Sequence, residues 1–199
     1  MKNCILILIS ILFVNCSSTD KKKEVNEYDL RIELINDLFV EIVNTNFNKV
    51  SYDKYRKRRD SSDYVVIFID KFSRVDKNYV QTEKYFPDSL NSNDYNVIFK
   101  KMIDSTLNDT STIDLNRITE TGEFKIRKYE KGLNFLRDTT MNFVTALMFS
   151  TPHFNDKFDK AMFGLSYFCG GTCGYESIIV CKKDKDKWLI TNNDINIEY

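Results

Sequence analysis

The residues best suited to chemistry are two cysteines in a glycine-rich segment, Cys169-Gly170-Gly171-Thr172-Cys173-Gly174. Glycine tolerates positive φ, so this segment predicts a tight reversal between two strands. Two cysteines four residues apart across such a turn can come within disulfide distance, about 4.4–6.8 Å between their Cα atoms. We therefore expect a structural disulfide between Cys169 and Cys173, which would contribute on the order of 2 kcal/mol through chain entropy.

Two other kinds of thiol chemistry remain as alternatives. A redox pair is one, but the spacing is not Cys-x-x-Cys and no helix start follows that would lower a thiol pKa. A zinc site of three cysteines and a histidine is the other, and it would add Cys181 and His153. In a simple hairpin Cys169 faces Tyr175, which puts Cys181 about 20 Å down the strand. We expect Cys181 to be reduced and buried, and we predict no metal and no cofactor.

His153 is the only histidine, so a Ser-His-Asp or Cys-His arrangement would have to include it. Its neighbours Phe154 and Phe158 indicate partial burial and favour a structural or solvent-exposed role. The chain has no nucleophile elbow, phosphate loop or dinucleotide fingerprint. These absences favour a protein without catalytic activity and without catalytic residues. The alternative is a carboxylate-based hydrolase that acts on glycans, which needs a pair of acids. This alternative stays open, because such a pair cannot be recognised among 29 Asp and Glu residues from a single sequence.

A cluster of positive charge lies in the segment Lys54-Tyr55-Arg56-Lys57-Arg58-Arg59. It could bind an acidic polymer, or anionic lipid heads at about 1 kcal/mol per cation. A solvated loop balanced by three nearby aspartates is the interpretation we favour. The residues of this candidate anion patch are Lys54, Arg56, Lys57, Arg58 and Arg59.

The N-terminus predicts where these residues act. Lys2 is followed by an apolar run from Cys4 to Val14 and then by Cys16. The run is too short to span a bilayer, which takes about 20 residues, but it fits the apolar region of a secretory signal. A cysteine directly after such a region resembles the signal of a bacterial lipoprotein, and Asn15 is similar to the looser usage of Bacteroidetes lipoproteins. The resemblance implies acylation of Cys16. The alternative is an ordinary signal peptide with an incidental Cys16.

The chain then divides into a signal peptide at residues 1–15, a lipidated cysteine with a flexible tether at 16–27, and a single α+β domain at 28–199. Basic and acidic side chains number 29 each, and this neutrality argues against non-specific nucleic-acid binding. We expect a lipid-anchored, non-catalytic binding or structural module of the cell envelope, in the outer membrane and facing the periplasm or the surface. Its expected partners are the membrane, through the lipid, and a glycan or an envelope protein.

Apolar periodicity predicts a helix over residues 30–43 and a second helix from Ser92 or Asn93 to residue 103. Short β-branched and aromatic runs predict the strands. They are expected at residues 64–72, 113–118, 124–129, 141–149, 161–169, 175–181 and 187–192, with a hairpin turn at 121–123. Helices before strands indicate an α+β fold, with the N-terminal helices packed on one face of an antiparallel sheet. By analogy the topology would be NTF2-like or cystatin-like.

The segment from Ser150 to Ile190 resembles the C-terminal region of uncharacterised Bacteroidetes lipoproteins. Those proteins carry an S-x-P-x-F-N stretch, a C-G-x-x-C-G turn and a K-x-x-x-K-W-like turn. This chain matches the order with Thr151-Pro152-His153-Phe154-Asn155, the cysteine turn and Lys185-Asp186-Lys187-Trp188. The resemblance implies a shared hairpin, but that group of proteins has no activity to carry over.

Overall fold

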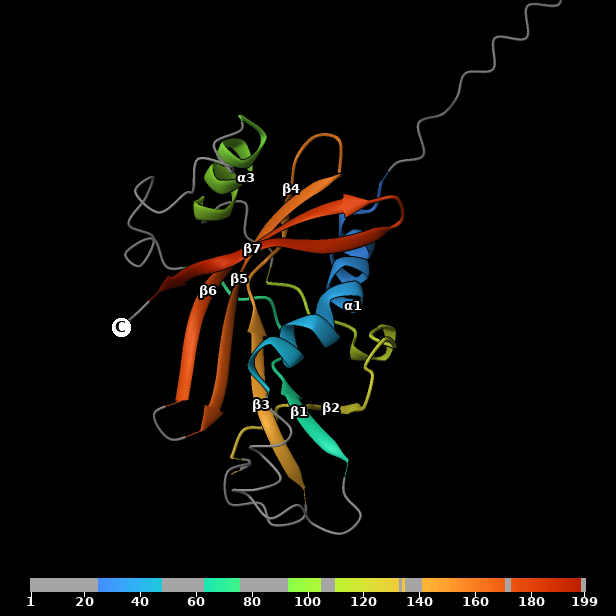
Figure 1. Ribbon diagram of the computed structural model, residues 1–199, viewed down its shortest axis with the longest axis vertical. Helices are drawn as coiled ribbons and strands as arrows, with labels where there is room; N and C mark the ends of the chain where they lie inside the picture. The colour runs from blue at the N-terminus through green and yellow to red at the C-terminus, as the bar shows by residue number, and fades with distance from the viewer. Residues whose placement is uncertain are drawn as a thin grey trace, which may run out of the picture.

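The computed structural model describes residues 25–47, 63–75, 93–104, 110–132, 134, 141–170 and 173–197. The elements of this part of the chain follow one another from blue to red in Figure 1. They are α1 (Glu27–Asn46), β1 (Tyr64–Phe68), α3 (Asn93–Ile103), the 3-10 helix η2 (Leu115–Arg117), β2 (Phe124–Lys128), β3 (Asn142–Phe149), β4 (His153–Phe154), β5 (Lys160–Gly170), β6 (Cys173–Asp184) and β7 (Lys187–Ile197).

The described strands form one curled sheet in the order β2-β1-β3-β5-β6-β7, with β4 paired to β5 (Figure 1). The pairs from β3 to β7 are antiparallel, whereas β1 runs parallel to both β2 and β3. The α+β class is therefore confirmed, but an entirely antiparallel sheet is not. Long connections permit the parallel pairs. The chain between Phe68 and Phe124, for example, includes the helix α3.

Helix α1 covers one face of the sheet. The side chain of Asn26 caps its start by accepting a hydrogen bond from the backbone N–H of Tyr28. The predicted apolar spacing is confirmed, because one face of the helix is buried against strand residues such as Val66, Leu147 and Phe163. The buried apolar residues of α1 are Ile32, Leu34, Ile35, Leu38, Phe39, Ile42 and Val43.

Helix α3 covers the other face. It begins at Asn93, as predicted, and buries Tyr95, Ile98, Phe99 and Met102. These side chains pack against Met162 of β5 and against Ile178 and Val180 of β6. Neighbouring residues in a strand point to opposite faces, so Met162 meets α3 while Phe163 lies in the core under α1.

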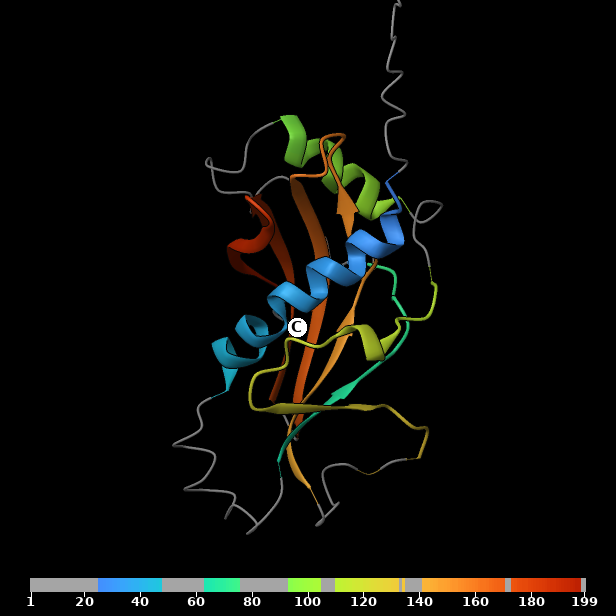
Figure 2. The same ribbon diagram turned by 90° about the vertical axis from the view of Figure 1, so that its right-hand side faces the viewer.

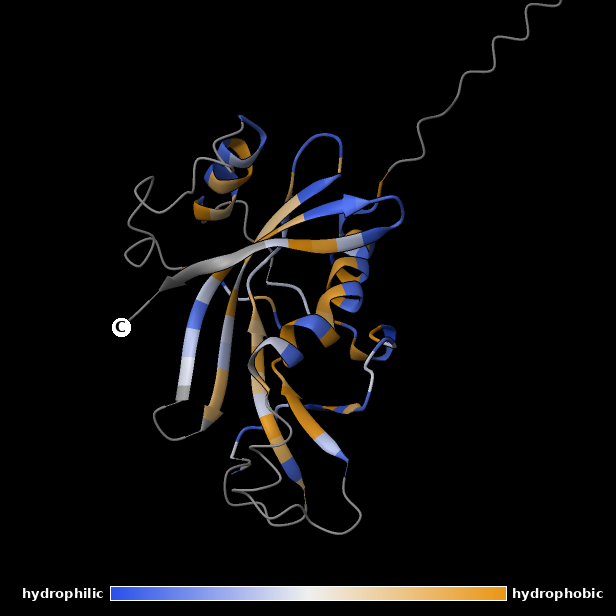
Figure 3. Cartoon of the chain, in the orientation of Figure 1, coloured by the Kyte–Doolittle hydropathy of each residue, from blue (hydrophilic) through white to orange (hydrophobic). Residues whose placement is uncertain are grey.

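The prediction that the helices pack on one face is therefore wrong. Figure 1 shows α1 and α3 on opposite sides of β5, and Figure 2 shows α1 crossing the sheet diagonally. The reason lies in β5 and β6, which carry buried apolar residues on both of their sides, so each face of the sheet needs a cover. In Figure 3 apolar and polar residues alternate along both helices, as expected for helices that each bury one side.

The predicted hairpin around Thr121-Gly122-Glu123 is also wrong. The turn exists, because Gly122 has a φ of +59° and the Phe124 N–H donates to the Thr121 carbonyl. The segment before it is not a strand but η2, whose first turn is capped by the side chain of Asp114. That cap satisfies the backbone locally, and β2 pairs with β1 instead.

The hairpins of β5, β6 and β7 are confirmed, with strands longer than predicted. At the glycine turn Phe168 pairs with Gly174 and Gly170 pairs with Cys173, with a register shift between these two pairs. Tyr167, not Cys169, therefore faces Tyr175, and their rings stack with centroids 5.2 Å apart. A Cβ at Gly174 would lie 3.1 Å from the Tyr167 carbonyl oxygen, so a larger residue there would push the two strands apart by a few tenths of an ångström.

Candidate functional site

Two of the predicted sites lie outside the described residues. These are the signal and lipidated cysteine, residues 1–16, and the candidate anion patch at residues 54–59. Residues 17–24 of the tether also lie outside. Acylation of Cys16 and anion binding by the patch therefore stay predictions.

The structure separates the cysteines into two groups. Cys169 is disulfide-bonded. The side chain of Cys173 lies outside the description, so its pairing with Cys169 stays a prediction. Cys181 is free and fully buried in the core under α1, as the sequence predicts, and burial raises its thiol pKa well above the usual value. It pairs with Ala161 at the other end of β5, so the register puts it far from the glycine turn.

His153 lies on β4, opposite Met162 of β5, and only 6% of it is exposed. Burial lowers the pKa of its imidazole to about 4, helped by the positive charges of Arg31 on α1 and Lys101 on α3. The histidine is therefore neutral at pH 7. It lies between the two helices and is more deeply buried than the sequence indicates.

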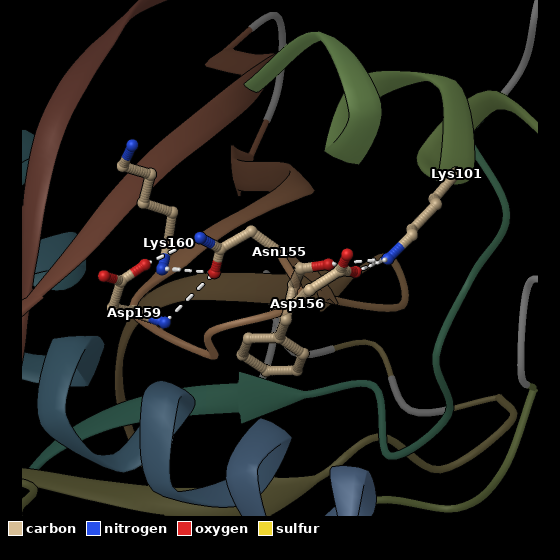
Figure 4. Close-up of polar contacts among 6 residues, drawn as sticks. Lys101, Asn155, Asp156, Asp159 and Lys160 are labelled. Carbon is tan, nitrogen blue, oxygen red and sulfur yellow. Dashed lines mark hydrogen bonds and ion pairs between the residues drawn. The ribbon is translucent and has the colours of Figure 1, made fainter. Parts of the chain in front are cut away.

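Asn155, two residues after His153, organises the turn between β4 and β5 (Figure 4). Its Oδ1 accepts hydrogen bonds from the backbone N–H groups of Asp159 and Lys160, each at 3.1 Å. Its Nδ2 donates to Asp159 Oδ1 at 2.7 Å. These three bonds stabilise a turn in which Phe158 has a φ of +56°. The side chain of Asn155 thus replaces the hydrogen bonds that a strand ladder would supply.

The same turn fastens α3 to the sheet. The Lys101 ammonium donates to the Phe154 carbonyl at 3.1 Å and pairs with Asp156 at 3.5 Å (Figure 4). At the other end of the helix, Lys160 Nζ lies 2.6 Å from Asp94 Oδ2. The hydrogen bond between these two side chains lowers the pKa of Asp94 and raises that of Lys160. Both ends of α3 are therefore held by charges next to Asn155.

Other residues of the segment from Ser150 to Ile190 also serve the fold. Ser150 Oγ accepts a hydrogen bond from the Gly164 N–H at 2.6 Å, which links β3 to β5. The ring of Phe154 packs against Trp188 with centroids 5.6 Å apart, and Trp188 is 1% exposed. The S-x-P-x-F-N stretch and the turn before Trp188 thus form one packed unit of β4 to β7.

Two carboxylic acids with shifted pKa values lie on α1, and the sequence analysis did not find them. Asp37 Oδ2 accepts a hydrogen bond from the backbone N–H of Trp188 at 2.9 Å. Its pKa is raised, chiefly by burial and further by the charges of Glu120 and Glu33. Burial also raises the pKa of Glu41, one helical turn further on. Their i, i+4 spacing in the sequence shows that the two acids share one face of the helix. Their raised pKa values could not be predicted, because they depend on burial by β7, which only the tertiary structure shows.

Two tests bear on metal and membrane chemistry. Among the described residues, no three histidine, cysteine or acidic side chains come together in a way that could hold a metal ion. Neither of the described α-helices is both long and apolar enough to cross a membrane.

Comparison of the chain with protein-family models, curated proteins and solved structures finds no match.

Replacing Asn155 with alanine is expected to lower the free energy of unfolding by about 2 kcal/mol, because two backbone N–H groups lose their buried acceptor. Asp156→Ala in the same turn is the control. Asp156 is exposed and makes only a weak ion pair, so its loss should cost less than about 0.5 kcal/mol. Urea denaturation of both variants checks this. Equal losses in the two variants would contradict the organising role of Asn155.

Proposed function

We propose that this chain is a lipid-anchored protein of the bacterial cell envelope, of the Bacteroidetes lipoprotein type, and that it works as a non-catalytic binding or structural module. The signal-like N-terminus with Cys16 supports the anchor. The outer membrane, facing the periplasm or the surface, is its proposed location. An NTF2-like or cystatin-like topology also remains a proposal, supported by the long helix α1 that crosses one face of the curled sheet.

One observation carries the non-catalytic interpretation: the residues best suited to chemistry are used to hold the fold. Neutral His153 is buried between α1 and α3. Asn155 makes three hydrogen bonds within its own turn, and Lys160 is paired with Asp94. A general acid or base must reach a substrate proton, and none of these groups is arranged for that. A binding module needs no such group.

A glycan or an envelope protein is the proposed partner, together with the membrane through the lipid. The candidate anion patch offers one way to bind an acidic polymer, because five cations lie within residues 54–59. Net neutrality of the whole chain argues against nucleic acid as a partner.

A glycan hydrolase is the alternative, and the acids on α1 favour it. A glycosidase needs a carboxylic acid that stays protonated near neutral pH, and burial shifts Asp37 and Glu41 in that direction. Against this, Asp37 already accepts the Trp188 N–H, so at least one of its oxygens serves the junction between α1 and β7.

The test offers envelope glycans, heparin and envelope proteins to the mature lipidated protein, and measures both retention and released sugar. We expect retention of at least one of them and no release of sugar. If heparin is retained, replacing Arg56, Arg58 and Arg59 with glutamine should reduce that retention. Failure to retain any of these partners would contradict the binding proposal.

Two matched variants separate the hydrolase from binding. Asp37→Asn keeps an oxygen that can accept the Trp188 N–H but removes the acid. Glu33→Gln alters a neighbouring acid on α1 that pairs with Lys183. Release of sugar that is lost in Asp37→Asn and kept in Glu33→Gln would replace the binding proposal with the hydrolase.

A further inference from the structure

The described domain has two ends, which we name by their relation to α1. The tether end holds the start of α1, the β4–β5 turn (residues 156–159) and the β6–β7 turn (residues 185–186). Figures 1 and 2 show these segments at the same end of the molecule. Contacts agree with this, because Lys183 next to the β6–β7 turn pairs with Glu33 in the second turn of α1.

The far end holds the other end of the helix. The ring of Phe47, directly after α1, packs against Tyr64 at the start of β1 and against Phe124 at the start of β2, with centroids 5.1 and 5.6 Å apart. β3 also begins there, since Tyr64 pairs with Asn142. The last residues of β5 and the first of β6 also lie at this end, because β5 runs away from the β4–β5 turn. The ten residue steps of β5 correspond to about 33 Å.

We propose that the tether end faces the lipid surface and that the far end, with the last residues of β5 and the first of β6, projects away from it. This orientation rests on the proposed anchor at Cys16. Ten residues separate Cys16 from Glu27, and a chain of that length spans at most about 33–36 Å. That is about the length of β5, so bringing the far end to the lipid would use the whole length of this segment.

Charge at the tether end is balanced. Its exposed turns carry lysines and aspartates side by side, such as Lys157 beside Asp156 and Lys185 beside Asp186, a mixture that neither binds tightly to anionic lipid heads nor is strongly repelled by them. The candidate anion patch lies in sequence between Phe47 and Tyr64 of the far end, so the orientation set by the tether alone is measured on vesicles of neutral lipid. A partner approaching from outside would first meet the far end. There Phe168, 38% exposed, precedes the disulfide-bonded Cys169.

Energy transfer from the protein to the membrane tests the orientation. The lipidated full chain is incorporated into vesicles of neutral lipid whose headgroups carry an acceptor dye. A donor dye is attached at Lys157→Cys in the tether end or at Lys125→Cys in the far end, where both lysines are exposed. Cys181 is fully buried and should not react, and protein without either substitution measures background labelling. We expect the donor at residue 157 to lose several times more fluorescence than the donor at residue 125.

Sedimentation of the vesicles separates the two ways in which this can fail. Protein that sediments with the lipid but shows equal transfer from both positions, or more from residue 125, would overturn the orientation alone. Protein that stays in the supernatant would overturn the anchor at Cys16, and the orientation with it.

Discussion

Replacing Cys16 with serine is expected to release the protein from the membrane. A buried methylene contributes about 0.8 kcal/mol to membrane binding, so the two or three long acyl chains of a lipoprotein hold it almost permanently, whereas one short chain does not. Serine has no thiol to acylate. The variant should remain unprocessed or become soluble, and its detergent partitioning and incorporation of labelled fatty acid should both be lost.

Cys4→Ser is the matched control for this prediction. Cys4 lies at the start of the apolar run, with no apolar region before it, so it cannot serve as the lipidation site. The Cys4 variant should be acylated like the natural chain. Acylation that persists in Cys16→Ser would contradict the lipoprotein proposal, and loss of acylation in both variants would point to damage of the signal itself.

Acidification from pH 6.5 to pH 4 is expected to cost the protein about 3 kcal/mol through His153 alone. The pKa of the imidazole is about 4 in the folded protein and about 6.5 in an unfolded chain. Between these values the unfolded chain binds a proton that the folded protein does not bind. The stability contributed by neutral His153 is therefore complete above pH 6.5 and is lost as the pH falls towards 4.

The charged groups around His153 define the experiment. Arg31 on α1 and Lys101 on α3 oppose its protonation, and each has an acidic neighbour, Glu27 and Asp156 respectively. His153→Gln removes the titrating group, so its free energy of unfolding should fall less steeply between pH 6.5 and 4 than that of the natural chain. Lys157→Gln, in the exposed turn nearby, should leave the slope unchanged. Identical slopes for the natural chain and His153→Gln, measured by urea denaturation, would contradict the prediction.

Helical and strand patterns could be predicted wherever one side of an element meets a core. The buried face of α1, including Leu34, Leu38 and Phe39, follows from spacing alone because the pattern repeats over about four turns. The glycine turn between β5 and β6 could also be predicted, because glycines favour a turn and short β-branched runs favour the strands on either side of it. The strand predicted around Leu115 is wrong because the side chain of Asp114 caps the backbone locally, and the segment forms η2 instead.

The residues of the candidate site also divide into those that the local sequence pattern identifies and those that depend on distant contacts. The sequence identified His153, the cysteine turn and the segment that ends at Trp188 as unusual. It missed the role of Asn155, because its hydrogen bonds to Asp159 and Lys160 need the turn to exist first. It also missed Asp37, whose pKa depends on burial under a strand 151 residues further along the chain.

By itself the sequence determined the class of the fold and the position of most elements, because caps and periodicity are local properties, whereas the anchor at Cys16 stays a prediction. Only the tertiary structure decided that α1 and α3 cover opposite faces, that β1 pairs in parallel, and that His153 is buried between positive charges. These outcomes depend on which distant surfaces meet, and residues such as Met162 and Phe163, adjacent and both apolar, are compatible with either arrangement until the sheet forms.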